Sequence, residues 1–171
     1  MDELSKWERL YEEEFALQID TRALRCPLRH GHFSSSIVVA RDVTPDQVYA
    51  ACKKHFPVSR TYRNLDSDVV LHERRPDSTY VMLVSESEES QVPFEQADGT
   101  CITLLEHLLF NLAHFKETGR LLDNKDITAC LGSRYIDGRV PTTLSHRGEL
   151  RIHWCSEHDK YSRLRTRLGL L

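Results

Sequence analysis

The feature that most constrains this chain is an apolar segment, TCITLLEHLLFNLAHFKETG, that begins at Thr100 and ends at Gly119. Its apolar residues recur at helical spacing and cover more than half of the circumference of a helix. A helix this apolar must be buried by more than one neighbour, so residues 100–118 are predicted to form the central helix of the fold. Thr100 or Thr103 is available as the N-cap, and Gly119 suits the left-handed residue that ends a helix.

Three further helices are predicted from start signals and apolar spacing. Residues 2–18 carry apolar side chains on one face and acidic side chains on the rest. Residues 44–56 begin with Thr44 as the N-cap and Pro45 at the first helical position. A short basic helix is predicted at the C-terminus, over residues 156–169.

Extended segments make up most of the rest of the chain. Residues 58–84 contain three short runs separated by turn residues, which predict an antiparallel meander. Asp137–Gly138 and Arg147–Gly148 each separate two extended runs and predict two hairpins. We therefore predict an α+β fold, in which a mainly antiparallel sheet packs against the central hydrophobic helix (100–118), with additional N-terminal, middle and C-terminal helices.

The length of 171 residues fits a single domain over residues 1–171. Residues 20–35 predict an irregular segment, and the acidic, aperiodic residues 86–98 predict an exposed loop. No run of about 18 apolar residues and no signal peptide is present, so we predict a cytoplasmic protein with no membrane association. The five cysteines never form a CxxC pair, which favours reduced thiols over a disulfide framework.

The formal net charge of −3 conceals an uneven distribution. Acids dominate the N-terminal helix and residues 86–98, whereas residues 131–171 hold eight Lys and Arg against four acids. Opposite charges of this kind pair within a fold, pair between two copies of a chain, or steer an anionic partner. The sequence leaves these three interpretations open.

Several short motifs follow one another between residues 102 and 141: ITLLE at 102–106, TGxxLD at 118–123, TxCxGSR at 128–134 and GxVP at 138–141. In these features, and in the later strand that contains Trp154, the chain resembles a family of conserved hypothetical bacterial proteins. The resemblance implies a bacterial or phage setting. It implies no catalytic role, because no activity is known for that family.

The first candidate site is the segment GSRYIDGR, together with the hairpin that follows it. Its backbone amides and forked guanidinium groups would suit a phosphate or a carboxylate. The segment has the spacing of neither a P-loop nor GxGxxG. The alternative is structural, with glycines that serve the turns and arginines that pair with nearby aspartates. The candidate anion-binding or partner-binding residues are Gly132, Ser133, Arg134, Arg139, Arg147 and Arg151.

The second candidate site would hold a metal. Two neighbouring strands of the second predicted hairpin and the segment after it carry histidine and cysteine side chains. Nitrogen and sulfur ligands of this kind would suit zinc, and a neighbouring glutamate would serve as the base for a zinc-bound water. The spacing matches no established zinc signature, and the alternative is exposed histidines with a buried thiol. The candidate ligands are His146, His153, Cys155 and His158.

Glu106 is the one ambiguous residue of the central helix. Because it lies among leucines, we predict a partly buried carboxylate paired with an arginine, for which Arg134 is our choice. Such a pair either specifies the fold or serves a functional site.

Nucleic-acid binding is disfavoured. Arg163 and Arg167 lie one helical turn apart in the predicted C-terminal helix, and Tyr161 would be placed to stack on a base. However, the sequence pI of about 6.3 is low for a nucleic-acid-binding protein, and no recognised motif is present.

Taken together, these patterns predict a binding or interaction module that recognises an anionic group or a partner through the 132–155 hairpins. A metal-dependent hydrolase that uses the His/Cys site is the first alternative. A structural homodimer, in which the acidic N-terminal helix contacts the basic C-terminal helix, is the second. The sequence specifies no substrate, reaction or partner.

Overall fold

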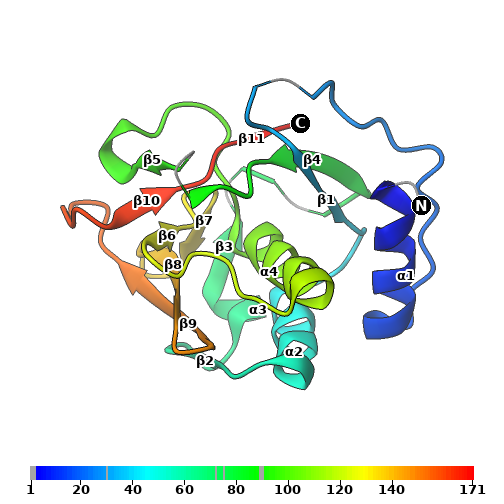
Figure 1. Cartoon of the computed structure of the whole chain (residues 1–171). Coiled ribbons are helices and arrows are strands. Elements are labelled where there is room, and N and C mark those ends of the chain that lie inside the picture. Colours follow the sequence, from blue (N-terminus) through cyan, green and yellow to red (C-terminus); the bar gives the residue numbers. More distant parts are fainter. Residues whose placement is uncertain (1–2, 30, 72, 75, 89–90) are drawn as a thin grey trace.

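A computed structural model describes residues 3–29, 31–71, 73–74, 76–88 and 91–171. Its central element is α4 (Leu104–Thr118), and every residue of this helix from Leu104 to Leu112 is buried. The helix packs against α2 (Pro45–His55) and β1 (Ser35–Val39), and Figure 1 shows it near the middle of the molecule. The prediction of a central hydrophobic helix is therefore confirmed, although the helix begins at Leu104 and not at Thr100.

Local sequence signals determine where α4 begins and ends. The hydroxyl of Thr103 accepts a hydrogen bond from the amide of Glu106 at 3.2 Å, and the Glu106 carboxylate accepts one from the Thr103 amide at 2.7 Å. This reciprocal pair is a capping box, which satisfies two amides that a helix start leaves free. Gly119 ends the helix with a φ of 70°, in the left-handed region that glycine adopts without strain.

The predicted N-terminal and middle helices are also present. Helix α2 has Thr44 as its N-cap, with a second capping box, and Pro45 as its first residue. Helix α1 (Glu3–Phe15) buries Trp7 and Tyr11, as well as Leu10, on one face. Figure 1 shows α1 on the outside of the molecule, next to β1.

The described strands form three sheets. An antiparallel sheet has the order β1-β4-β11, a mixed sheet has the order β2-β9-β8-β6-β10-β5, and a third sheet pairs β3 with β7. The α+β class is therefore confirmed, with mostly antiparallel pairing. The strands not yet given are β2 (Val58–Arg60), β3 (Val69–Leu71), β4 (Tyr80–Val84), β5 (Val92–Pro93), β6 (Ile127–Ala129), β7 (Ser133–Tyr135), β8 (Val140–His146), β9 (Glu149–Cys155), β10 (Leu164–Thr166) and β11 (Gly169–Leu170).

The predicted meander over residues 58–84 is wrong. Its three strands enter three different sheets: β2 pairs in parallel with β9, β3 pairs with β7, and β4 pairs with β1 and β11. A four-residue helix, α3 (Leu65–Asp68), also lies between the first two of them. Turn residues indicated where each strand ends, but they carried no information about distant partners.

The predicted C-terminal helix is also wrong. Residues 164–166 form β10 and residues 169–170 form β11. In β10, Leu164 and Thr166 are buried and Arg165 between them is half-buried, so the segment follows the two-residue period of a strand. The sparse apolar residues of this basic segment also fit a helix, which led to the error.

The segment predicted as an exposed acidic loop is partly ordered and partly buried. Gln91 is only 4% exposed, and its side-chain amide donates to a carboxylate oxygen of Asp123 at 2.7 Å. Beyond it, β5 pairs with β10, and a short 3-10 helix, η2, spans Phe94–Gln96. Positions 89 and 90 of the predicted loop lie outside the described residues.

Several charges of the acidic and basic regions pair within the chain. Lys116 of α4 contacts Glu13 at 2.7 Å and Glu14 at 2.5 Å, and Lys6 contacts Glu117 at 2.6 Å. At the other end of the chain, Arg165 and Arg167 pair with Asp126 and Asp123. No helix in the described part of the chain is long and apolar enough to cross a membrane.

Candidate functional site

The hairpin β8–β9 forms the scaffold of the predicted binding face. Its register runs from Val140 opposite Cys155 to His146 opposite Glu149. Arg147 and Gly148 connect the strands with φ angles of 51° and 78°. Two consecutive left-handed residues define the tight turn that matches the twist of a hairpin, which confirms the predicted turn at this position. The hairpin predicted at Asp137–Gly138 is wrong: this turn leads from one sheet to another, since β7 pairs with β3 whereas β8 pairs with β6 and β9.

The predicted anion-binding donors at the start of β7 have partners within the chain. The amide of Gly132 donates to the carbonyl of Ile102, and the amide of Ser133 donates to the carbonyl of Cys130, both at 3.0 Å. The hydroxyl of Ser133 accepts a hydrogen bond from the first amide of α4, that of Leu104, at 3.0 Å. Arg134 donates to two backbone carbonyls at 2.7 and 2.8 Å. The bonds of the Gly132 amide and the Ser133 hydroxyl therefore connect the start of β7 to the start of α4, whereas those of the Ser133 amide and Arg134 are local.

Close packing explains why residue 132 is a glycine. A Cβ atom at this position would lie 2.7 Å from the carbonyl oxygen of Cys101 and 2.9 Å from Cγ2 of Thr103. Both distances are shorter than a side chain tolerates, and the first involves backbone. The glycine therefore allows β7 to approach the N-terminus of α4.

The remaining arginines of the predicted site do not converge on one point. Arg139 precedes β8 and Arg147 follows it, so the seven residues of this strand, whose ends lie about 20 Å apart, separate the two arginines. Arg151 lies along β9 and contacts the carboxylate of Glu149 at 2.9 Å. A small anion would therefore meet at most part of the predicted residue set.

The end of the hairpin near Arg139 instead carries an exposed patch of aromatic, aliphatic and guanidinium groups. The guanidinium carbon of Arg139 lies 3.7 Å from the centroid of the Trp154 indole, a distance typical of a cation–π contact. Trp154 is 39% exposed and Ile136 is 74% exposed. We call Tyr62, Ile136, Arg139 and Trp154 the Trp154 patch.

Tyr62 extends this patch from a distant part of the sequence. Its ring stacks on that of Tyr135, with centroids 3.9 Å apart, and its hydroxyl donates to the Asp137 carboxylate at 2.5 Å. That hydrogen bond holds the pKa of Asp137 below its usual value, and the neighbouring Arg139 acts in the same direction. Tyr62 was not predicted from the sequence, because it lies far before the hairpin and follows no local motif.

The structure does not bring the four candidate metal ligands together. His146 pairs with Glu149 and His153 pairs with Thr142, four residues and about 13 Å further along β8. His153 contacts the hydroxyl of Thr61 at 3.0 Å and His158 is exposed. Burial raises the pKa of the Cys155 thiol to about 12, which disfavours the thiolate that binds metals. No group of three or more potential ligands occurs among the described residues.

The predicted burial of Glu106 is confirmed, but its predicted partner is wrong. The carboxylate is fully buried and accepts hydrogen bonds from Arg74 at 2.5 and 2.7 Å and from Tyr80 at 2.8 Å. Burial alone would lower the pKa of Arg74, but the hydrogen bond and charge of Glu106 outweigh it and raise that pKa. Arg134, the predicted partner, is bonded to backbone carbonyls instead.

A second buried polar cluster lies further along α4. His107 is fully buried, and its Nε2 lies 3.3 Å from the Asp123 carboxylate. The same carboxylate pairs with Arg167 and accepts a hydrogen bond from the hydroxyl of Thr128 at 2.7 Å. Burial lowers the pKa of His107 to about 4; Asp123 opposes this effect and Arg167 adds to it. Because both ions of the Asp123–Arg167 pair are only 2% exposed, this cluster connects α4 to the C-terminal segment inside the protein.

Comparisons with family models, with curated proteins and with solved structures find no match to this chain.

Proposed function

We propose that this protein is an interaction module that binds a protein partner through the Trp154 patch. The observation that carries the proposal is the stack of Arg139 on the partly exposed indole of Trp154. The turn that leads to Arg139 also contains Ile136, whose side chain is exposed. Trp, Tyr and Arg are the residue types that most often contribute the binding energy at protein interfaces.

The surroundings of the patch hold its side chains in place before any partner binds. Tyr62 is held by its stack on Tyr135 and by its hydrogen bond to Asp137, while the stack on Trp154 orients Arg139. Ordering such side chains in advance reduces the entropy lost on association. The backbone of the turn is fixed as well, because the amide of Tyr135 donates to the carbonyl of Arg139 at 2.8 Å.

A protein partner is favoured over a small anion. The backbone amides of Gly132 and Ser133 are already bonded within the chain, so a bound phosphate would have to displace native hydrogen bonds. Arg139 also has a carboxylate nearby, that of Asp137 at 3.7 Å. A partner side chain that packs on Ile136 and Trp154 needs no such displacement.

The proposal is tested by affinity capture followed by measured binding. Immobilised wild-type protein, a double variant Ile136→Ser/Trp154→Ala and a control variant Tyr161→Ser are each exposed to an extract of the source cells. Tyr161 is 62% exposed and lies outside the patch. We expect a protein that wild type and control retain and the patch variant loses. With both proteins purified, Trp154→Ala should weaken the Kd at least about 30-fold.

Two results would overturn the proposal. The first is a partner whose Kd is unchanged by the patch substitutions. The second is equal loss of binding in the Tyr161→Ser control, which would indicate a non-specific effect of removing exposed aromatic groups. Circular dichroism and urea unfolding verify that the variants are folded, so lost binding is not confused with lost structure.

A further inference from the structure

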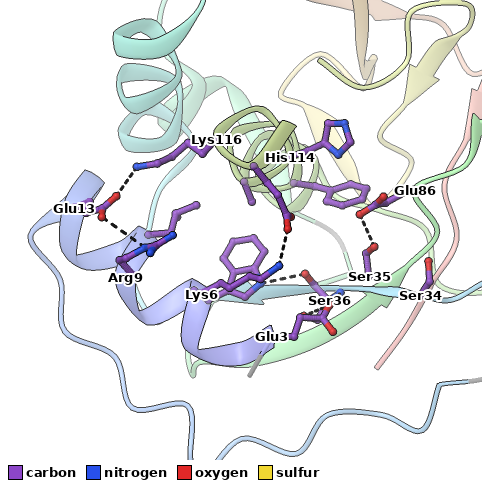
Figure 2. A pocket seen from close by; sticks show the side chains of 15 residues that line it. Glu3, Lys6, Arg9, Glu13, Ser34, Ser35, Ser36, Glu86, His114 and Lys116 are labelled. Atoms are coloured by element: carbon purple, nitrogen blue, oxygen red, sulfur yellow. Dashed lines mark hydrogen bonds and ion pairs between the residues drawn. The ribbon is translucent and has the colours of Figure 1, made fainter. Parts of the chain in front are cut away.

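A cleft of about 410 Å³ lies between α1, α4 and the start of β1, away from the β8–β9 hairpin. Figure 2 shows the side chains of α1 and α4 on either side of it, with Ser34 and the first two residues of β1, Ser35 and Ser36, at its end. This cleft could not be predicted from the sequence, because its walls come from segments about 100 residues apart.

The floor of the cleft is apolar. Trp7 and Leu10 of α1 and Phe110 and Ala113 of α4 line it, and the first three are at most 6% exposed. The indole of Trp7 is fixed by a hydrogen bond from Nε1 to the carbonyl of Ser36 at 3.2 Å. A ligand that covers this floor must therefore carry an apolar group, and the two aromatic rings would also favour a nearby cation.

Most of the Lys, Arg and Glu side chains that line the cleft form ion pairs with described residues. Lys6 contacts Glu117 at 2.6 Å, and Lys116 contacts Glu13 at 2.7 Å, so these ion pairs join α1 to α4 (Figure 2).

The carboxylate at the serine end differs from these. Glu3 pairs with Arg29, whereas Glu86 only accepts a hydrogen bond from the hydroxyl of Ser35 at 2.7 Å. Among the described residues, no cation lies within ion-pair distance of Glu86. The cleft thus has a negative charge available at one end and an apolar floor beside it.

We propose that this cleft binds an organic ammonium ion that carries an apolar, preferably aromatic, group. The apolar group covers Trp7 and Phe110, and the ammonium group donates to the carboxylate of Glu86 and to the hydroxyl oxygens of Ser34 and Ser35, which also line the cleft. A carboxylate ligand of the same shape is repelled by Glu86, and a neutral alcohol lacks the ion pair. This site is independent of the Trp154 patch.

Phenethylamine, 2-phenylethanol and 3-phenylpropionate are suitable probes, because they share a ring and differ in the charge of the polar group. Binding is followed by NMR at the indole N–H of Trp7, which Trp154→Phe assigns by elimination. We expect phenethylamine to shift this signal and to bind at least tenfold more tightly than the other two. Glu86→Gln should abolish that preference, whereas Glu157→Gln, which removes an exposed carboxylate outside the cleft, should preserve it.

A larger side chain on the floor provides a second test. Ala113→Phe should block binding of phenethylamine while the unfolding midpoint in urea shows that the protein remains folded. The proposal is overturned if the alcohol or the acid binds as tightly as the amine, if the Trp7 signal does not respond, or if Glu86→Gln leaves the preference intact.

Discussion

The hydroxyl of Tyr11 donates a hydrogen bond to the carbonyl of Val38 at 2.8 Å and accepts one from the amide of Ala40 at 3.0 Å. Tyr11 belongs to α1, whereas Val38 and Ala40 lie on or just after β1, which is the edge strand of its sheet. A single side chain therefore occupies the donor and the acceptor that a neighbouring strand would otherwise pair with.

The same relationship extends along α1. Trp7 donates to the carbonyl of Ser36 at 3.2 Å, and Glu3 accepts from the amide of Ser36 at 2.8 Å. Four residues of a helix rise about 6 Å, and two residues of a strand span about 6.8 Å. Side chains spaced by four on α1 can therefore follow backbone groups spaced by two on β1.

Tyr11→Phe should lower the free energy of unfolding by about 1–3 kcal/mol, because it leaves two buried backbone groups with no partner while preserving the ring. Urea unfolding provides the measurement. Tyr161→Phe removes an exposed hydroxyl and should change stability by less than about 0.5 kcal/mol. Equal effects of the two substitutions would show that the hydroxyl of Tyr11 does not stabilise the edge of β1.

Elements whose signals are local were predictable from the sequence. Thr44 and Thr103 cap their helices as expected, Gly119 ends α4, and Arg147–Gly148 forms the predicted turn. Each of these features depends on a few consecutive residues, whose conformational preferences act without the rest of the fold.

Features that depend on distant partners were not predictable. Val58 of β2 pairs with Leu150, and Glu106 selects Arg74 rather than Arg134. Arg167 is only 2% exposed. An arginine is rarely buried without a partner of opposite charge, and its partner here, Asp123, could not be identified from the sequence. The Trp154 patch and the cleft depend on the same kind of non-local assembly.

Glu106 and Arg74 should show strong energetic coupling. Glu106→Gln removes the charge that pairs with a largely buried guanidinium group, so we expect a loss of about 3–5 kcal/mol. The double variant Glu106→Gln/Arg74→Met should be more stable than the sum of the single effects predicts, by about 0.5–3 kcal/mol. A parallel double-mutant cycle of Glu106→Gln with Arg134→Met should give no coupling energy. Coupling in that cycle alone would show that Arg134, and not Arg74, is the partner of Glu106.

Gly132→Ala should destabilise the protein by about 1–3 kcal/mol, because the added methyl group would press on the carbonyl of Cys101. Gly138→Ala is the comparison, since a Cβ at that exposed turn meets no atom within 4 Å and only its positive φ of 85° opposes the change. Its cost should be about 1 kcal/mol. Thermal unfolding of both variants measures the difference, and a Gly132→Ala protein as stable as wild type would remove the packing explanation for this glycine.

His107 should make the protein sensitive to mild acid. Its pKa is about 4 in the folded protein, against 6.5 for an ordinary histidine, so between these values the unfolded chain binds more protons than the folded one. The stability that depends on the neutral imidazole is therefore fully present above about pH 6.5 and is lost as the pH falls towards 4. The total loss in the free energy of unfolding should be about 3 kcal/mol. Urea unfolding from pH 7.5 to 4 measures this slope.

The slope should decrease in His107→Gln, whatever that substitution does to stability at pH 7.5, because the proton uptake itself is removed. His158→Gln is the matched control, since its side chain is 88% exposed, and it should retain the wild-type slope. Some carboxylates also stabilise the folded protein, such as Asp20, whose pKa is lowered to about 2 by hydrogen bonds from Arg22. The stability that such groups contribute is lost mainly below pH 4. A slope between pH 6.5 and 4 that persists in His107→Gln would therefore assign the acid sensitivity to a group other than the buried imidazole.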